Sequence, residues 1–188
     1  MDILELSERI ITEVRTSPKA TGAYLTREEA DAVASCPDLD ELCDAADHIC
    51  RTLMGEEVDS CSIVNARSGL CGEDCKWCAQ SVRHHTGCDV YEHLEDAEIL
   101  EAGRRNSKEG IHRLSLVTSG RALGDRELDR LCEAYRRLAD TTGLGLCASM
   151  GLLDEKQLRR LKEAGVTRYH CNMETSRNFF PKLCTTHT

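Results

Sequence analysis

Residues 71–78 read Cys71-Gly72-Glu73-Asp74-Cys75-Lys76-Trp77-Cys78, which places three thiols at C-x3-C-x2-C spacing with an aromatic residue before the last one. An apolar stretch over residues 61–66 precedes this loop and predicts a short strand. Three thiolates in one tight loop can hold three irons of a four-iron cluster and leave the fourth iron open to another molecule. The spacing therefore predicts an enzyme rather than a structural metal site.

Two other uses of these thiols stay open. A structural zinc site needs four ligands, and Cys75 and Cys78 supply only one C-x2-C pair, so His84, His85 or Cys88 would have to complete it. Disulfide exchange would need the same pair beside a thioredoxin-like pattern, which the flanking sequence lacks. The four-iron cluster explains more of the motif because it uses all three thiols.

The composition is that of a globular chain, and it disfavours two classes of partner. The chain has 188 residues, 40% of them hydrophobic and 30% charged, with a formal net charge of −9. This negative charge, together with only 4% aromatic residues, argues against nucleic acid and against an anionic membrane surface. No apolar run approaches the roughly 20 residues that a membrane span needs, and the acidic N-terminus lacks the pattern of a secretion signal.

Twelve cysteines are present, which is many for a chain of this length. In a secreted protein they would indicate a disulfide framework. Without a secretion signal, and with long helical segments, reduced thiols in a reducing cytoplasm are the better interpretation. We therefore expect a cytoplasmic protein in which some of the thiols bind metal.

Residues 58–188 alternate between expected strands and helices, which is typical of a parallel sheet covered by helices. The spacing alone fits either a doubly wound sheet or a (β/α) barrel. The expected strands are 61–66, 113–118, 144–150 and 166–172, and the expected helices are 94–108, 125–142 and 154–163, with a further helix beginning near Thr175.

Residues 1–57 are expected to form a helical extension that precedes the sheet. Thr26 and Glu29 fit a capping box for a helix over 26–34, and Pro37 opens a second helix that ends at Gly55. Cys43 and Cys50 share one face of that second helix. They are interpreted as small core residues, with a metal pair as the alternative.

The cysteine loop after a first strand resembles the radical S-adenosylmethionine superfamily. Three segments are further similar to the biotin synthase family within it: 62–81, 145–151 and 169–176. This resemblance begins near residue 40 and covers only the N-terminal half, or somewhat more, of that family's chain. It implies a (β/α)8 TIM-type barrel, of which residues 58–188 supply about the first four β/α units.

The resemblance also assigns roles to single residues. Cys71, Cys75 and Cys78 match the ligands of a [4Fe-4S] cluster. Trp77 and Glu174 match positions that contact S-adenosylmethionine, the acidic group accepting both ribose hydroxyls, and Asn172 matches a substrate contact for a ureido ring. Residues i and i+2 of a strand project to the same side, so the last two are expected to point together. The alternative role for either is to cap a following helix.

A second cluster in the family donates sulfur, and here the sequence departs from the family pattern. Ser115 and Ser149 stand where many members have cysteines, and hydroxyl groups are poor ligands for a soft-metal site. Cys147 and Cys171 lie nearby on neighbouring expected strands. We interpret them as possible ligands of a different auxiliary cluster, and two small buried thiols are the alternative.

The implied reaction is sulfur insertion into dethiobiotin to give biotin. The resemblance also implies a flavodoxin-type electron donor and a homodimer. Two rival functions stay open: a related radical S-adenosylmethionine enzyme acting on another small molecule, and an inactive truncated fragment that binds iron and sulfide. The second arises because four strands make only about half of a barrel.

Overall fold

The computed structural model describes residues 2–19 and 22–188, which divide into two compact units, Met1–Val58 and Asp59–Thr188. The first unit is helical and the second contains the whole sheet. Across the described residues, no helix is long and apolar enough to cross a membrane.

Three helices make up the first unit: α1 (Ile3–Thr16), α2 (Arg27–Ala34) and α3 (Leu39–Met54). The expected capping box of α2 is present, because Thr26 accepts from the backbone of Glu29 while the Glu29 side chain accepts from the backbone of Thr26. The expectation that Cys43 and Cys50 are core residues is wrong, since both side chains are exposed. Their face of α3 packs against nothing within the described chain that buries them.

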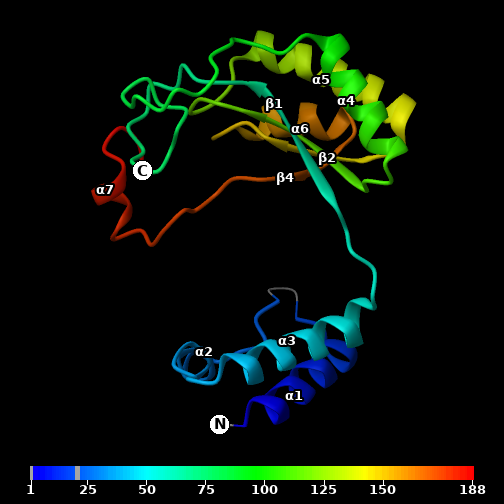
Figure 1. Cartoon of the computed structure of the whole chain (residues 1–188), viewed down its shortest axis with the longest axis vertical. Helices are drawn as coiled ribbons and strands as arrows, with labels where there is room; N and C mark the ends of the chain where they lie inside the picture. Colours follow the sequence, from blue (N-terminus) through cyan, green and yellow to red (C-terminus); the bar gives the residue numbers. More distant parts are fainter. Residues whose placement is uncertain (1, 20–21) are drawn as a thin grey trace. The chain divides into compact units, whose positions relative to one another are not determined.

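The second unit is a four-stranded parallel sheet in the order β1-β2-β3-β4, with a helix between each pair of successive strands. Figure 1 shows α4, α5 and α6 on one face of this sheet. The strands are β1 (Cys61–Arg67), β2 (Arg113–Thr118), β3 (Gly145–Ser149) and β4 (Val166–Tyr169), and the helices are α4 (Asp96–Lys108), α5 (Asp125–Thr142), α6 (Glu155–Glu163) and α7 (Phe180–Leu183).

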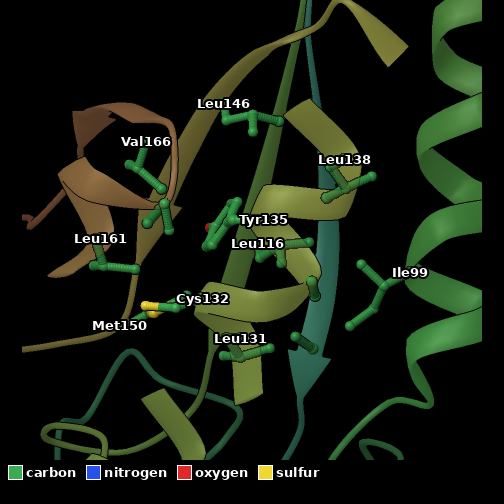
Figure 2. Close-up of a cluster of buried hydrophobic side chains, with 14 of the residues drawn as sticks. Ile99, Leu116, Leu131, Cys132, Tyr135, Leu138, Leu146, Met150, Leu161 and Val166 are labelled. Carbon is green, nitrogen blue, oxygen red and sulfur yellow. The ribbon is translucent and has the colours of Figure 1, made fainter. Parts of the chain in front are cut away.

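The core lies between the sheet and its three helices, and strand alternation explains which residues enter it. Leu114 and Leu116 of β2 point to the helices and are fully buried, while Ile63 on the opposite face of β1 is 69% exposed. Tyr135 of α5 is also fully buried among these side chains (Figure 2), and its hydroxyl donates to the carbonyl oxygen of Cys147 at 2.7 Å. The core therefore fixes the sheet on one face and leaves its other face open.

The bounds of β2 and α5 agree with the sequence expectation, whereas the end of the chain differs. β4 ends at Tyr169, where the expected strand continued to residue 172, and α7 begins at Phe180 rather than near Thr175. The sheet partner explains the shorter strand, because β3 ends at Ser149 and the pairing closes with the His170 amide, which donates to the Ala148 carbonyl at 2.8 Å. Residues 170–179 are free to turn toward the loop that follows β1.

Candidate metal centre

A cavity of about 1110 Å³ lies at the carboxyl ends of the strands, where parallel α/β folds place their sites. Its walls come from the ends of β1, β2 and β3, from the segment after β4, and from the last residues of the chain. Seven of the candidate site residues from the sequence line it: Cys71, Cys75, Trp77, Cys78, Cys171, Asn172 and Glu174. The structure thus brings the expected cofactor and substrate residues to one place.

The cysteine loop is held by its own flanks. Gly69 and Leu70 take positive φ angles of 69° and 58°, which turn the chain sharply after β1. The side-chain oxygen of Gln80 accepts from the Gly69 amide and the Ser68 hydroxyl, and the Cys71 amide donates to the Gln80 carbonyl at 3.1 Å. Gln80 therefore closes the loop, a role that its place just after the motif did not reveal.

The three thiols differ in burial and are suited to a group larger than one ion. Cys71 is buried, whereas Cys75 and Cys78 are partly exposed to the cavity. Burial, and then the neighbouring thiol of Cys184, raises the pKa of Cys75 to about 12, so a bound metal must supply the positive charge that a thiolate needs there. The sulfur atoms of Cys71, Cys75 and Cys78 do not gather within 4.8 Å of one another, as the ligands of a single ion would.

A seam of contacts joins the cysteine loop to residues 180–187, and we call it the C-terminal seam. Figure 1 shows α7 and the C-terminus beside the loop that follows β1. Four of the five spacer residues in the motif take part. Glu73 pairs with His187 at 2.8 Å, Asp74 binds Thr185 and Thr186, the Lys76 amide donates to Leu183 at 3.0 Å, and Trp77 meets Phe180 edge-on with ring centroids 5.9 Å apart.

Asp74 is the most heavily bonded residue of the seam. Its carboxylate accepts from the backbone amides of Thr185 (2.8 Å) and Thr186 (3.2 Å) and from both of their hydroxyls. In return, the Asp74 amide donates to the Thr186 hydroxyl at 3.1 Å. These bonds, with the Thr185 hydroxyl first and its amide next, hold the pKa of Asp74 well below its usual range. The loop geometry thus depends on a segment about 110 residues further along the chain.

Asp74→Asn should loosen the C-terminal seam, because the amide removes the charge that strengthens four hydrogen bonds. We expect the amides of Thr185 and Thr186 to exchange with solvent roughly tenfold faster in the variant. The folded pKa of Asp74 lies below its unfolded value of about 3.9, so its stabilisation is complete above about pH 5 and declines as pH falls through the folded pKa. The difference in hydrogen-exchange rate between the variant and the unsubstituted chain should be constant from pH 7 to about pH 5. It should become smaller at lower pH, where Asp74 itself gains a proton.

The matched control is Asp89→Asn, which removes an exposed carboxylate for which the described residues provide no hydrogen bond. It should leave the exchange of Thr185 and Thr186 unchanged. Equal exchange in both variants at every pH would contradict a charge-dependent seam.

Asn172 and Glu174 both line the cavity, but they lie beyond the end of β4. The alternation expected of a strand therefore does not apply to them, and Glu174 has a positive φ of 59°. Neither caps α7, which begins after Phe179. Among the described residues, neither side chain makes a hydrogen bond or an ion pair, so both polar groups are available to a molecule in the cavity.

Cys147 and Cys171 occupy different surroundings. Cys171 is exposed and lines the cavity, whereas Cys147 is buried on β3 and is absent from the cavity wall. The Cys147 thiol instead interacts with Cys61 and Arg113, and this contact adds to burial in raising the pKa of Cys61. The zinc alternative through residues 84–88 also loses support, because His84 bonds to the Cys78 carbonyl and Cys88 to the Ala79 carbonyl.

A comparison with protein-family models shows which family this metal centre belongs to. The sequence model described as "Radical SAM superfamily" matches residues 67–188, which include the cysteine loop, all of β2 to β4 and the C-terminal seam. The chain belongs to the radical SAM superfamily. Membership implies a [4Fe-4S] cluster and S-adenosylmethionine (SAM), and the three cavity thiols fit such a cluster in number and ligand softness.

Two curated relatives of this radical SAM chain are biotin synthases. The chain is 44% identical over 188 residues to a biotin synthase from Alkaliphilus metalliredigens, covering all of this chain and 56% of the relative. It is 49% identical over 169 residues to a biotin synthase from Heliobacterium modesticaldum, covering 89% of this chain and 52% of the relative. The chain therefore spans about half the length of the curated relatives it matches.

Solved structures place the radical SAM chain in the same fold. Methylornithine synthase has a TM-score of 0.77 at 20% identity, covering 97% of this chain and 52% of that one. A maturase of the [FeFe]-hydrogenase has a TM-score of 0.76 at 17% identity, covering 99% of this chain and 40% of that one. At these identities the likeness concerns the fold alone, and it confirms the expected partial TIM-type barrel.

Proposed function

We propose that this chain carries the radical-generating part of a biotin synthase, which inserts sulfur into dethiobiotin to form biotin. The observation that carries the proposal is the 44–49% identity to biotin synthases from several bacteria, which runs through the cysteine loop and the C-terminal seam. In this arrangement residues 58–188 form the part that holds the cofactors, and residues 1–57 form a helical extension.

The chemistry needs a radical because the carbons that receive sulfur carry no acidic proton. No protein acid or base can deprotonate such a carbon. When bound, the [4Fe-4S] cluster and SAM supply a 5′-deoxyadenosyl radical that removes hydrogen from it. The protein's share is binding, orientation and exclusion of water.

Six of the cavity residues then have defined tasks. Cys71, Cys75 and Cys78 hold three irons through their thiolates, and the C-terminal seam keeps the spacer residues between them in place. Trp77 lies beside the adenosyl group, and Glu174 accepts hydrogen bonds from its ribose hydroxyls. Asn172 pairs with the ureido ring of dethiobiotin, because its amide can both donate and accept.

For the sulfur source, we propose an auxiliary iron–sulfur cluster that Cys147 and Cys171 help to bind. The cavity position of Cys171 supports its part, whereas Cys147 must reach such a cluster from a buried position on β3. Alanine at both positions is expected to lower iron and sulfide content beyond that of the [4Fe-4S] cluster. A flavodoxin-type electron donor and a homodimer complete the proposal.

Glu174→Gln should weaken SAM binding about 10- to 100-fold, because a neutral amide replaces a charged acceptor of two hydroxyl groups. Isothermal titration of the reconstituted chain measures this change. Glu92→Gln, at an exposed residue outside the cavity, is the matched control and should bind SAM normally. An unchanged affinity in Glu174→Gln would remove the ribose role.

Anaerobic reconstitution of the chain with iron and sulfide tests the whole proposal. The chain should develop the absorption and electron paramagnetic resonance of a [4Fe-4S] cluster, and a reductant should then yield 5′-deoxyadenosine from SAM. Dethiobiotin should stimulate this cleavage. Stimulation by another small molecule but not by dethiobiotin would favour a related radical SAM enzyme, and a cluster without cleavage would favour an inactive fragment.

A further inference from the structure

A second set of metal-binding side chains meets at the C-terminal seam. The thiol of Cys184 lies 3.6 Å from the thiol of Cys75 and 3.1 Å from Nδ1 of His187, and that nitrogen lies 2.8 Å from a carboxylate oxygen of Glu73. Across residues 2–19 and 22–188, Cys75, Cys184 and His187 are the one group of three such side chains whose donor atoms all lie within 4.8 Å of one another. Two segments of the chain therefore converge on a single point.

These distances suit one small tetrahedral ion. Zinc bonds of about 2.3 Å to sulfur and about 2.0 Å to nitrogen or oxygen, at tetrahedral angles, separate the donor atoms by roughly 3.3–3.8 Å. The observed separation of the two thiols falls in this range, and the contacts of His187 with Cys184 and Glu73 need to lengthen by only a few tenths of an ångström. The Glu73 carboxylate touches His187 but lies outside the close group, so it must move to become the fourth ligand. Two thiolates with an imidazole favour a soft or borderline ion such as Zn²⁺ over Mg²⁺ or Ca²⁺.

The surroundings give this site both enclosure and access. Cys184 is 1% exposed, so a bound ion is shielded from water on that side. Cys75, Glu73 and His187 line the cavity, which provides a path for an ion to enter. The backbone at both ends is anchored, since Asp74 binds Thr185 and Thr186 between the ligand positions.

We propose that Cys75, Cys184 and His187 form a zinc site of the cluster-free protein, with Glu73 as a fourth ligand once its carboxylate moves from His187 toward the thiols, and that zinc and the [4Fe-4S] cluster exclude each other. The exclusion follows from Cys75, which belongs to both ligand sets, and this part rests on the proposed function. Zinc capture of Cys75 draws its thiolate toward Cys184 and leaves the cluster with two of its three ligands. Zinc then blocks cluster assembly until a stronger chelator removes it.

Three variants of the reduced, metal-free full chain separate the two ligand sets under anaerobic conditions. Cys184→Ser and His187→Ala should weaken Zn²⁺ binding by about 100-fold or more, since even outer-shell changes cost 10- to 100-fold. Cys71→Ser should bind Zn²⁺ as the unsubstituted chain does, although it loses a ligand of the cluster. Competition with a chromogenic chelator measures the affinities, and Co²⁺ in place of Zn²⁺ should give the absorption bands of a tetrahedral thiolate site.

X-ray absorption of the zinc-loaded, unsubstituted chain gives a measurement that does not depend on any variant folding. We expect two sulfur and two nitrogen or oxygen neighbours around Zn²⁺. Three or four sulfur neighbours, or loss of Zn²⁺ binding in Cys71→Ser, would place the ion among the cluster cysteines and overturn the proposal.

Cluster reconstitution after zinc loading tests the exclusion. Prior Zn²⁺ should suppress cluster formation in the unsubstituted chain and have little effect in Cys184→Ser. Equal suppression in both, with Zn²⁺ bound tightly only to the unsubstituted chain, would overturn the exclusion. Failure of the metal-free, unsubstituted chain to form any cluster would instead refute the proposed function, while the zinc affinities would still decide the site.

Discussion

Serine in place of Cys78 should abolish assembly of the [4Fe-4S] cluster and, with it, reductive cleavage of SAM. Iron in such a cluster prefers soft thiolate ligands, and a serine hydroxyl is a hard and weakly acidic replacement. With Cys78 gone, Cys71 and Cys75 are the two thiols of the motif that remain for three irons. Because outer-shell changes alone cost 10- to 100-fold in metal affinity, loss of a ligand should lower 5′-deoxyadenosine formation by more than ~100-fold.

Cys88→Ser is the matched control, because Cys88 belongs to the segment after the motif and its thiol bonds to the Ala79 carbonyl. Iron and sulfide analysis, visible absorption and 5′-deoxyadenosine formation should be normal in this variant. Full cluster content in Cys78→Ser would show that another thiol replaces it, and Cys184, next to Cys75, would be the first to substitute in that background.

Periodic burial made the core elements predictable from the sequence. α5 buries Leu128, Leu131, Tyr135 and Leu138 at helical spacing, and its bounds agree with the expected helix because these side chains belong to the core between the sheet and its helices. β2 behaves likewise, with Leu114 and Leu116 turned toward the helices. Where the chain buries a regular pattern, local sequence and tertiary structure give the same answer.

Sequence periodicity gave wrong predictions where no neighbouring element buries the residues, and where a strand's partner in the sheet ends early. Cys43 and Cys50 have the spacing of core residues, yet they are exposed, since periodicity alone does not show whether a partner covers the face. The expected strand continues to residue 172, but β3 ends at Ser149, and the bond from the His170 amide to the Ala148 carbonyl closes the pairing. The three cluster thiols were found by spacing alone because their motif is local.

The C-terminal seam lay outside the reach of sequence reasoning. Asp74 and the pair Thr185 and Thr186 are ordinary polar residues, and they meet only because the fold returns the chain to the loop after β1. Cys184 and His187 lie more than 100 residues from Cys75 and form no motif with it, whereas His84, His85 and Cys88 lie close enough in the sequence to suggest zinc ligands.

Gly151→Ala should be among the most destabilising single-methyl changes in the sheet unit. Gly151 has a φ of 78°, and an added Cβ would lie 2.1 Å from the backbone oxygen of Arg121, which cannot move as a side chain can. The same place holds a bridge between the loops after β2 and β3: the Leu152 amide donates to Arg121 at 2.7 Å, and the Tyr169 hydroxyl donates to Gly151 at 2.6 Å. We expect a loss of ~3–4 kcal/mol, from left-handed strain together with these broken hydrogen bonds.

Gly110→Ala isolates the strain, because Gly110 has a φ of 77° and no atom within 4 Å of its added Cβ. It should cost only about 1–2 kcal/mol, so the difference between the variants measures the clash with Arg121. Trp77 is the single tryptophan of the chain and lies in the sheet unit, so its fluorescence during urea unfolding reports on that unit alone. Gly151 and Arg121 also line the cavity, and SAM binding should fall in Gly151→Ala but not in Gly110→Ala. Equal losses of stability in the two variants would mean that the loop after β2 moves easily to accommodate the added Cβ. The carboxyl ends of β2 and β3 would then be too flexible to fix the position of the cavity wall.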